Sequence, residues 1–305
     1  MAQFHQLPSR KDPKDSAWEA SNVEAEERTK AAPTAAIPSL SHLSFHDFDE
    51  VYEPAEDTYL FLDALLHEMD NESFAEGRIQ DEGPFIVLEI GCGSGVVSVF
   101  VRNQWKTRSG DWELQSFVTD VNRRALEVAL ETDRANNGVN SNQRRSETDE
   151  STDSANPKSS SASTGTINPP LFLHSMEAIL CDLATPLLSR LQGQIDVLLF
   201  NPPYVPTEDD EVGIHDISAA WAGGVKGRRV VDRAIPQMAQ LLRPKSGKAF
   251  VVTVDDNRPS EMAHILWENH QLVMKPLFRR RSRNEYLTIQ KITFEQHDND
   301  QTGDE

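Results

Sequence analysis

Residues 85–95 read FIVLEIGCGSG, an apolar run followed by glycines at alternate positions. The first six residues are apolar except for Glu89, which is typical of a strand that is buried on both faces of a sheet. The glycines that follow let the backbone turn sharply and approach a ligand closely. In open α/β sheets such a loop lies beyond the carboxyl end of a strand, where ligands bind. The segment therefore predicts a parallel α/β fold with a small-molecule site at this loop.

Outward from this segment, apolar runs alternate with helical patterns. The alternation predicts a mostly parallel sheet that helices cover on both faces. No helix separates the last two strands, so we expect them to pair antiparallel at one edge. The predicted strands lie at 85–90, 117–119, 178–181, 195–200, 249–254, 272–277 and 286–292, and the predicted helices at 95–103, 123–136, 231–242 and 260–270.

Composition restricts the class of protein. The chain has 305 residues and a net charge of −19 at pH 7, which disfavours unaided binding to nucleic acid. Its two cysteines, Cys92 and Cys181, exclude a disulfide framework and a cysteine-based zinc cluster. They favour a reducing compartment, the cytoplasm or the nucleus. No apolar run reaches the roughly 20 residues of a membrane span, and the first residues lack the pattern of a signal peptide.

Three segments lack the apolar pattern that a core requires, and we predict that they are disordered. They are an N-terminal extension at 1–44, a Ser/Thr/Asn-rich insertion at about 138–168, and an acidic tail at 295–305. The remaining residues, 45–294, predict a single folded domain that the insertion interrupts.

Acidic residues follow the predicted strands near the glycine loop. The loop has the spacing G-x-G-x-G, with Glu89 ahead of it, and this spacing suits a cofactor without a pyrophosphate. Asp120 ends the second strand, where a carboxylate can accept both hydrogen bonds of a ribose diol; the alternative is that it caps the next helix. After the third strand, we expect Asp182 to accept from an adenine amino group and Leu183 to pack on the ring; the alternative is an ordinary loop.

The fourth strand ends in Asn201-Pro202-Pro203-Tyr204, the most specific motif of the chain. The prolines remove two backbone donors, so a backbone carbonyl and the Asn201 side-chain oxygen are left as neighbouring acceptors. Two acceptors match the two hydrogens of an –NH₂ group, and Tyr204 offers a flat wall for a planar amide or base. The alternative is a proline-rich turn without chemistry. We predict methyl transfer to a planar nitrogen, driven by orientation and electrostatics rather than by a general base.

Further motifs lie before and after the glycine loop and the Asn-Pro-Pro-Tyr motif. VYEPAEDTYL spans residues 51–60, AAWAGG spans 219–224, and GR follows at 227–228. With LEIGCGSGVVS and FNPPYVPT, they resemble the HemK-like family of protein glutamine methyltransferases, in its eukaryotic branch, over most of 48–294. The resemblance implies a Rossmann-like, seven-stranded class I methyltransferase fold and S-adenosylmethionine as cofactor. It implies a substrate, the glutamine of the Gly-Gly-Gln loop in the eukaryotic class-1 peptide-chain release factor.

The resemblance also assigns residues by position. The implied cofactor contacts are Thr58, Glu89, Gly91, Asp120, Asp182, Leu183 and Asn201. The implied substrate contacts are Asn201, Pro202, Pro203, Tyr204 and Val205, and we expect Asn201, Pro202 and Tyr204 to be the catalytic residues. The resemblance further implies a partner: enzymes of this branch work as heterodimers with a small zinc-binding activator protein. We expect the activator to cover the sheet near the second and third strands.

Other interpretations stay open at this point. The tetrad Asn201-Pro202-Pro203-Tyr204 also occurs in enzymes that methylate the exocyclic amine of adenine in nucleic acids. Methylation of protein lysine has been proposed for the branch as well. An inactive scaffold is a further alternative, which the intact Glu89, Asp120 and Asn201 oppose. A basic run at 278–283, FRRRSR, would suit RNA or an acidic protein, but we predict a solvated loop between the closing strands.

Overall fold

The computed structural model of the chain describes residues 13–71, 73–78, 82–109, 112–137, 176–208 and 220–295. Residues 1–12, the predicted insertion at 138–168 and the tail after residue 295 lie outside the described ranges. The strands are β1 Phe85–Ile90, β2 Leu114–Asp120, β3 Met176–Leu180, β4 Val197–Phe200, β5 Lys248–Val254, β6 Leu272–Ser282 and β7 Glu285–Phe294. The helices are α1 Pro13–Ala31, α2 Glu56–Asp70, α3 Val96–Arg108, α4 Arg123–Asn137, α5 Arg229–Leu241 and α6 Pro259–His270.

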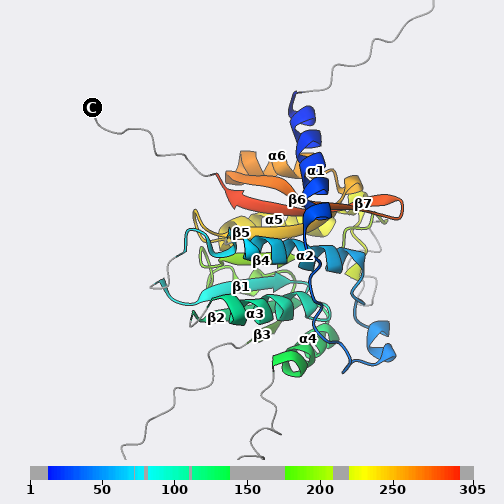
Figure 1. Cartoon of the computed structure of the whole chain (residues 1–305), viewed down its shortest axis with the longest axis vertical. Helices are drawn as coiled ribbons and strands as arrows, with labels where there is room; N and C mark the ends of the chain where they lie inside the picture. The colour runs from blue at the N-terminus through cyan, green and yellow to red at the C-terminus, as the bar shows by residue number, and fades with distance from the viewer. Residues whose placement is uncertain are drawn as a thin grey trace, which may run out of the picture.

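The strands form one seven-stranded sheet in the order β3-β2-β1-β4-β5-β7-β6 (Figure 1). Strands β1 to β5 pair parallel with one another. At the other end of the sheet, β7 pairs antiparallel with both β5 and β6. This arrangement confirms the predicted fold class, including the antiparallel edge. The chain order reverses on the two sides of β1, so the carboxyl ends of β1 and β4 meet at a switch point, where ligands bind in such sheets.

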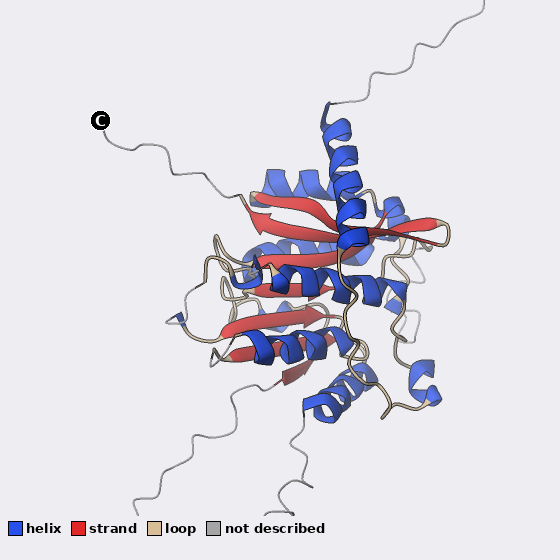
Figure 2. Ribbon diagram, in the orientation of Figure 1, coloured by secondary structure: helices blue, strands red, loops and turns tan. Residues whose placement is uncertain are grey.

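Helices cover both faces of the sheet (Figure 2). Alternate residues of β1 point to opposite faces. Phe85 and Val87 pack in one core with α2 and α3, whereas Ile86 and Leu88 pack in a second core with α5 and α6. The strand is therefore apolar throughout because both of its faces are covered. None of the helices in the described ranges combines the length and the apolar character that a membrane crossing requires.

Helix α1 shows that the prediction of disorder at 1–44 is wrong for the described part of that segment. The helix packs along β6, the edge strand. The Thr29 hydroxyl accepts from the backbone N–H of Arg279 at 2.8 Å, Arg28 donates to a backbone carbonyl of β6 at 2.7 Å, and Ala25 is fully buried. The contact uses mostly small side chains and hydrogen bonds, together with Trp18, so the sequence of α1 shows no apolar stripe.

Residues 278–282 of the basic run lie in a strand, which corrects the prediction of a solvated loop for this part; Arg283 follows in the turn between β6 and β7. β6 pairs with β7 up to Ser282. Within it, Arg279 is buried and forms two hydrogen bonds with Asp255, at 2.8 and 2.9 Å, and Arg280 donates to Asp63 at 2.8 Å. The partner carboxylates come from other parts of the chain, so the charges of Arg279 and Arg280 are paired within the fold, whereas Arg281 and Arg283 are exposed.

Candidate active site

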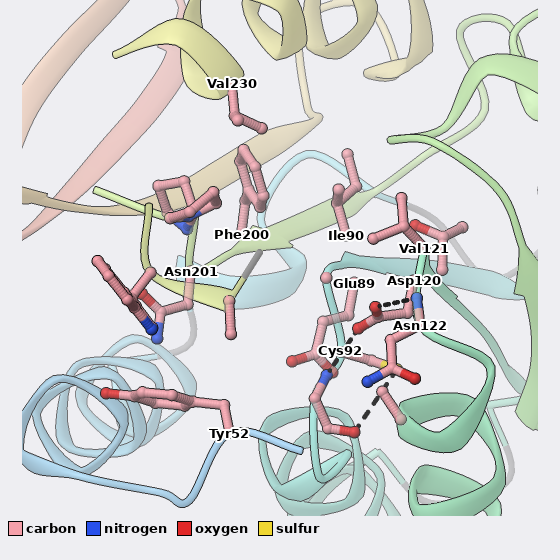
Figure 3. Close-up of a pocket in the computed structure, with 18 of the residues that line it drawn as sticks. Tyr52, Glu89, Ile90, Cys92, Asp120, Val121, Asn122, Phe200, Asn201 and Val230 are labelled. Atoms are coloured by element: carbon pink, nitrogen blue, oxygen red, sulfur yellow. Dashed lines mark hydrogen bonds between the residues drawn. The ribbon is translucent and has the colours of Figure 1, made fainter. Parts of the chain in front are cut away.

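A cavity of about 260 Å³ opens at the carboxyl ends of β1, β2, β3 and β4 (Figure 3). This volume is near the lower end of the roughly 300–1,000 Å³ typical of small-ligand sites. All residues that the sequence predicted for the site line this cavity: Thr58, Glu89, Gly91, Asp120, Asp182, Leu183, Asn201, Pro202, Pro203, Tyr204 and Val205. In the described part of the chain, no cluster of three His, Cys, Asp or Glu side chains is arranged to hold a metal ion.

The glycine loop joins β1 to α3 at the bottom of the cavity. Gly91 and Gly95 have φ angles of 66° and 75°, in the left-handed region that favours glycine. A Cβ at Gly95 would lie 2.7 Å from Ala129 of α4, so this glycine also permits α3 and α4 to pack closely. The N–H groups of Gly91 and Cys92 donate to the carbonyl of Thr119, at 2.8 and 3.1 Å. The loop is therefore fixed to β2 by its own backbone.

Glu89 holds the other end of the loop. Its carboxylate accepts from the backbone N–H of Ser98 at 3.0 Å and from the Ser98 hydroxyl. Ser98 lies in the first turn of α3, so the carboxylate caps this helix from the strand before it. Burial raises the pKa of Glu89 to about 8, against the opposing effect of the Ser98 hydrogen bonds. The acid is thus a buried support of the cavity wall.

Asp120 ends β2 and faces the same cavity. Its carboxylate accepts from the backbone N–H of Gly93 at 3.1 Å and of Asn122 at 2.8 Å, and burial raises its pKa. The Asn122 side chain accepts from the N–H of Arg124 at 2.9 Å. Asn122 therefore caps α4, and the alternative that Asp120 is the cap is wrong. Figure 3 shows Asp120 and Asn122 on the side of the cavity opposite Asn201.

Asp182 and Leu183 follow β3. The Asp182 carboxylate forms an ion pair with Arg233 of α5, a partner that the sequence did not indicate. Leu183 has a φ of 54°, which is uncommon for a residue other than glycine, and its side chain is buried in the cavity wall. Strained backbone of this kind persists where the surrounding structure fixes it, and it is frequent in ligand sites.

Asn201 follows β4 directly. Its Nδ2 donates to Oδ2 of Asp57 at 2.9 Å, and a carboxylate can only accept, so this bond fixes the orientation of the amide. The other amide atom, Oδ1, is buried and has no hydrogen-bond partner among the described residues. Leaving a buried acceptor unpaired costs about 1–3 kcal/mol. A ligand that donates a hydrogen here would remove that cost.

Asp57, in the first turn of α2, is a central site residue that the sequence analysis missed. Its side chain is 2% exposed. Besides Asn201, it accepts from the hydroxyls of Tyr52 and Tyr204, each at 3.1 Å, and from the backbone N–H of Thr58 at 2.7 Å. Burial, and then the charge of Asp57, raise the pKa of both phenols. In the sequence, an acid at this position reads only as a favourable charge at a helix N-terminus.

The AAWAGG and GR motifs contact the backbone of the Asn201-Pro202-Pro203-Tyr204 tetrad and of Val205. Val205 and Ala222 form an isolated parallel bridge. Asn257 donates to the backbone carbonyl of Tyr204 at 2.9 Å. A Cβ at Gly227 would lie 1.8 Å from the same carbonyl oxygen, so only glycine allows this close approach. The motifs therefore hold the segment after β4 in place.

Comparison with curated proteins finds relatives along most of the chain. Methyltransferase HEMK2 of Mus musculus is 37% identical over 76% of this chain and 85% of its own length. Methyltransferase HEMK2 of Homo sapiens is 35% identical over 86% of this chain and 99% of its own length. The eRF1 methyltransferase catalytic subunit mtq2 of Schizosaccharomyces pombe is 30% identical over 84% of this chain and 95% of its own length.

Among solved structures, the E. cuniculi Mtq2–Trm112 complex, responsible for methylation of the eRF1 translation termination factor, is similar. It is 26% identical with a TM-score of 0.47, over 80% of this chain and 99% of that chain. No protein-family model matches the chain.

Proposed function

This chain belongs to the family of HEMK2 and Mtq2 methyltransferases, and we propose that it transfers a methyl group from S-adenosylmethionine to a glutamine side-chain amide of the release factor eRF1. One observation carries the choice of target atom. The buried Oδ1 of Asn201 has no partner among the described residues, and Asn201 is one of the residues that line the cavity. An –NH₂ group is a donor that would satisfy it. The target glutamine is the one in the Gly-Gly-Gln loop.

The cofactor half of the cavity would hold S-adenosylmethionine, whose sulfonium supplies an activated methyl group when bound. Gly91 brings bare backbone to the cavity, where a Cβ would approach the Phe200 ring at 3.8 Å. Asp120 would accept from the ribose hydroxyls, Asp182 would accept from the adenine amino group, and Leu183 would pack on the ring. With Gly91, these residues lie at three strand ends, so a single elongated nucleoside could contact all of them.

The substrate half of the cavity orients the amide. Oδ1 of Asn201 accepts one amide hydrogen, and the segment from Pro202 to Val205 contacts the rest of the target side chain, with Tyr204 as a flat wall. Holding nitrogen and methyl group in line supplies much of the rate. The acceptors stabilise the positive charge that develops on the nitrogen. After transfer, the nitrogen loses its extra proton to water.

Charge favours a glutamine amide over the two alternatives, an adenine amine and a lysine amine. An adenine amine presents the same two hydrogens, but the net charge is −19, and Arg279 and Arg280 of the basic run form ion pairs within the fold. This leaves less positive charge for a phosphate backbone. A lysine nitrogen is an ammonium near neutral pH and must lose a proton before it can attack, whereas a carboxamide is neutral.

We further propose that a small zinc-binding activator packs against β3. Within the described residues, β3 pairs with β2 alone, and Leu180 is 57% exposed. A strand edge and an exposed leucine suit contact by strand addition. The S. pombe relative is named a catalytic subunit, which supports an assembly with a second chain. The location of the enzyme, cytoplasm or nucleus, stays a prediction.

A methyl-transfer assay tests this function. The full chain, with its activator, is incubated with labelled S-adenosylmethionine and either eRF1 or an eRF1 variant that carries alanine at the target glutamine. We expect label in the first protein and background in the second. Equal label in both would contradict the glutamine assignment, and label in added RNA or DNA in place of protein would support the adenine alternative.

A further inference from the structure

We propose that Asp57 is a positioning residue that makes the substrate half of the cavity a surface of acceptors, and that it thereby selects a carboxamide over a carboxylate. The inference rests on the proposed function, because it concerns glutamine against glutamate at the same target position. Asp57 lies in α2, outside the tetrad, so this helix would contribute to the selection of glutamine over glutamate.

Asp57 gathers the donors around it. Its Oδ2 accepts from Asn201 Nδ2 at 2.9 Å and from the hydroxyls of Tyr204 and Tyr52, each at 3.1 Å. Its Oδ1 accepts from the backbone N–H of Thr58 at 2.7 Å. The backbone contact and the burial of the side chain fix the carboxylate in place. The three side chains that donate to Oδ2 also line the cavity, and Figure 3 shows Tyr52 and Asn201 on the same side of it.

The carboxylate decides which atoms face the substrate. If the Asn201 amide turned over, its Oδ1 would face Oδ2 of Asp57, and two acceptors would meet without a hydrogen between them. The amide therefore keeps its –NH₂ toward Asp57, which leaves Oδ1 as the atom that can accept from a substrate. Each phenol has a single hydrogen, and Tyr52 and Tyr204 use theirs on the carboxylate. The Asn201 amide oxygen and the two phenol oxygens can therefore only accept hydrogen bonds from a ligand.

The charge of Asp57 acts in the same direction. None of the salt bridges among the described residues includes Asp57. A buried negative charge without a cationic partner repels a second carboxylate strongly, since the local dielectric constant is low. It favours the positive charge that grows on an amide nitrogen during methyl transfer. Glutamine is thus accepted for its two hydrogens, and glutamate is rejected because it has none and carries charge.

Asp63 offers a matched control on the same helix. It is a buried aspartate that accepts from the backbone N–H of Ala35 and from Arg280, both at 2.8 Å, and it does not line the cavity. Asp57→Asn and Asp63→Asn remove the same charge from the same helix. A merely structural role for Asp57 predicts the same behaviour from both: a lower Tm and normal turnover per folded molecule.

The first test measures turnover of eRF1 by the full chain with its activator, together with S-adenosylmethionine affinity by calorimetry and Tm. For Asp57→Asn we expect kcat to fall by about tenfold or more, as for a misplaced reactant, with cofactor affinity within about threefold. For Asp63→Asn we expect normal kcat. An Asp57→Asn enzyme with normal turnover per folded molecule would overturn the proposal.

The second test measures selectivity. Binding of eRF1 and of its variant with glutamate at the target position is compared by calorimetry in the presence of S-adenosylhomocysteine. The unaltered chain should prefer glutamine by at least about tenfold, and Asp57→Asn should reduce the preference to about twofold. Asp57→Glu keeps the charge and should keep the preference while losing turnover. An unchanged preference in Asp57→Asn, or a lost preference in Asp57→Glu, contradicts the proposal.

The two proposals fail differently. If the unaltered chain does not methylate eRF1 at glutamine, the proposed function is wrong. If it does, and Asp57→Asn matches Asp63→Asn in turnover and selectivity, the function stands and the role of Asp57 is wrong.

Discussion

The two halves of the cavity differ in how their polar groups are satisfied. In the cofactor half, Glu89 accepts from Ser98, and Asp120 accepts from the backbone of Gly93 and Asn122. In the substrate half, Oδ1 of Asn201 has no partner among the described residues. The first half is held by main-chain hydrogen bonds, whereas the second is completed only when a substrate donates to it.

This difference separates binding from turnover. A cofactor half held by backbone should bind its ligand whether or not the substrate half is intact. A substrate half whose acceptor awaits a donor should affect the rate of transfer and leave cofactor affinity almost unchanged. Substitutions in the two halves should therefore give opposite kinetic patterns.

The largest effect is expected for Asn201→Ala. Without Oδ1 the amide nitrogen is no longer aimed at the methyl group, so kcat should fall by about 10²-fold or more, with near-normal cofactor affinity. Single-turnover rates, calorimetry and thermal melting together measure this. A variant that is destabilised but turns over normally per folded molecule would remove the tetrad from the mechanism and abolish the contrast between the halves.

Asp120→Ala should give the opposite pattern. Loss of hydrogen bonds to a charged group should weaken S-adenosylmethionine binding by about 1.5–3 kcal/mol. At saturating cofactor, kcat should stay close to that of the unaltered chain. Calorimetry and saturation kinetics distinguish the two parameters. Unchanged affinity would show that the ribose is not held by Asp120.

The pH dependence of stability should report on the cofactor half. Burial raises the pKa of Glu89 from 4.5 to about 8, so between these values the folded protein binds more protons than the unfolded chain. The free energy of unfolding should then fall as the pH rises through this window, by roughly a few kcal/mol. Glu89→Gln cannot titrate and should show a shallower dependence in denaturant unfolding between pH 5 and 8. Parallel curves for the two proteins would contradict the shifted pKa.

The smallest effect on turnover is expected from removing residues 1–31, which include helix α1. Loss of α1 uncovers β6 and removes its hydrogen bonds with Arg28 and Thr29, each worth about 0.5–1.5 kcal/mol, so Tm should fall. Turnover per folded molecule should stay within about twofold, because none of the residues of α1 lines the cavity. A loss of more than about tenfold in a folded enzyme would show that α1 takes part in substrate docking.

The central strands could be predicted because their apolar runs are continuous. The strand predicted at 85–90 has the same bounds as β1 for this reason. The outer edge was harder to predict. At the charged end of β6, Arg279 pairs with Asp255 and Arg280 with Asp63. Helix α1 contacts the edge mainly through small residues and Trp18, so neither segment shows a local apolar pattern.

The same contrast holds in the site. Residues at the carboxyl end of a strand or directly after it, such as Asp120 and Asn201, could be placed because parallel strands bring their carboxyl ends together. Asp57 could not, because its partner Asn201 lies 144 residues further along the chain and no strand end marks its position. Hydrogen bonds between such distant side chains become visible only in the folded structure.

The most direct test of the account is to locate the methyl group. The full chain and its activator are incubated with S-adenosylmethionine and eRF1, and the peptides of eRF1 are sequenced by mass spectrometry, with Asn201→Ala as the matched control. We predict one methyl group on the side-chain nitrogen of the Gly-Gly-Gln glutamine with the unaltered chain, and none above background with Asn201→Ala. A methyl group on a lysine, or equal methylation by the two enzymes, would contradict an unpaired acceptor on Asn201 as the feature that selects the target.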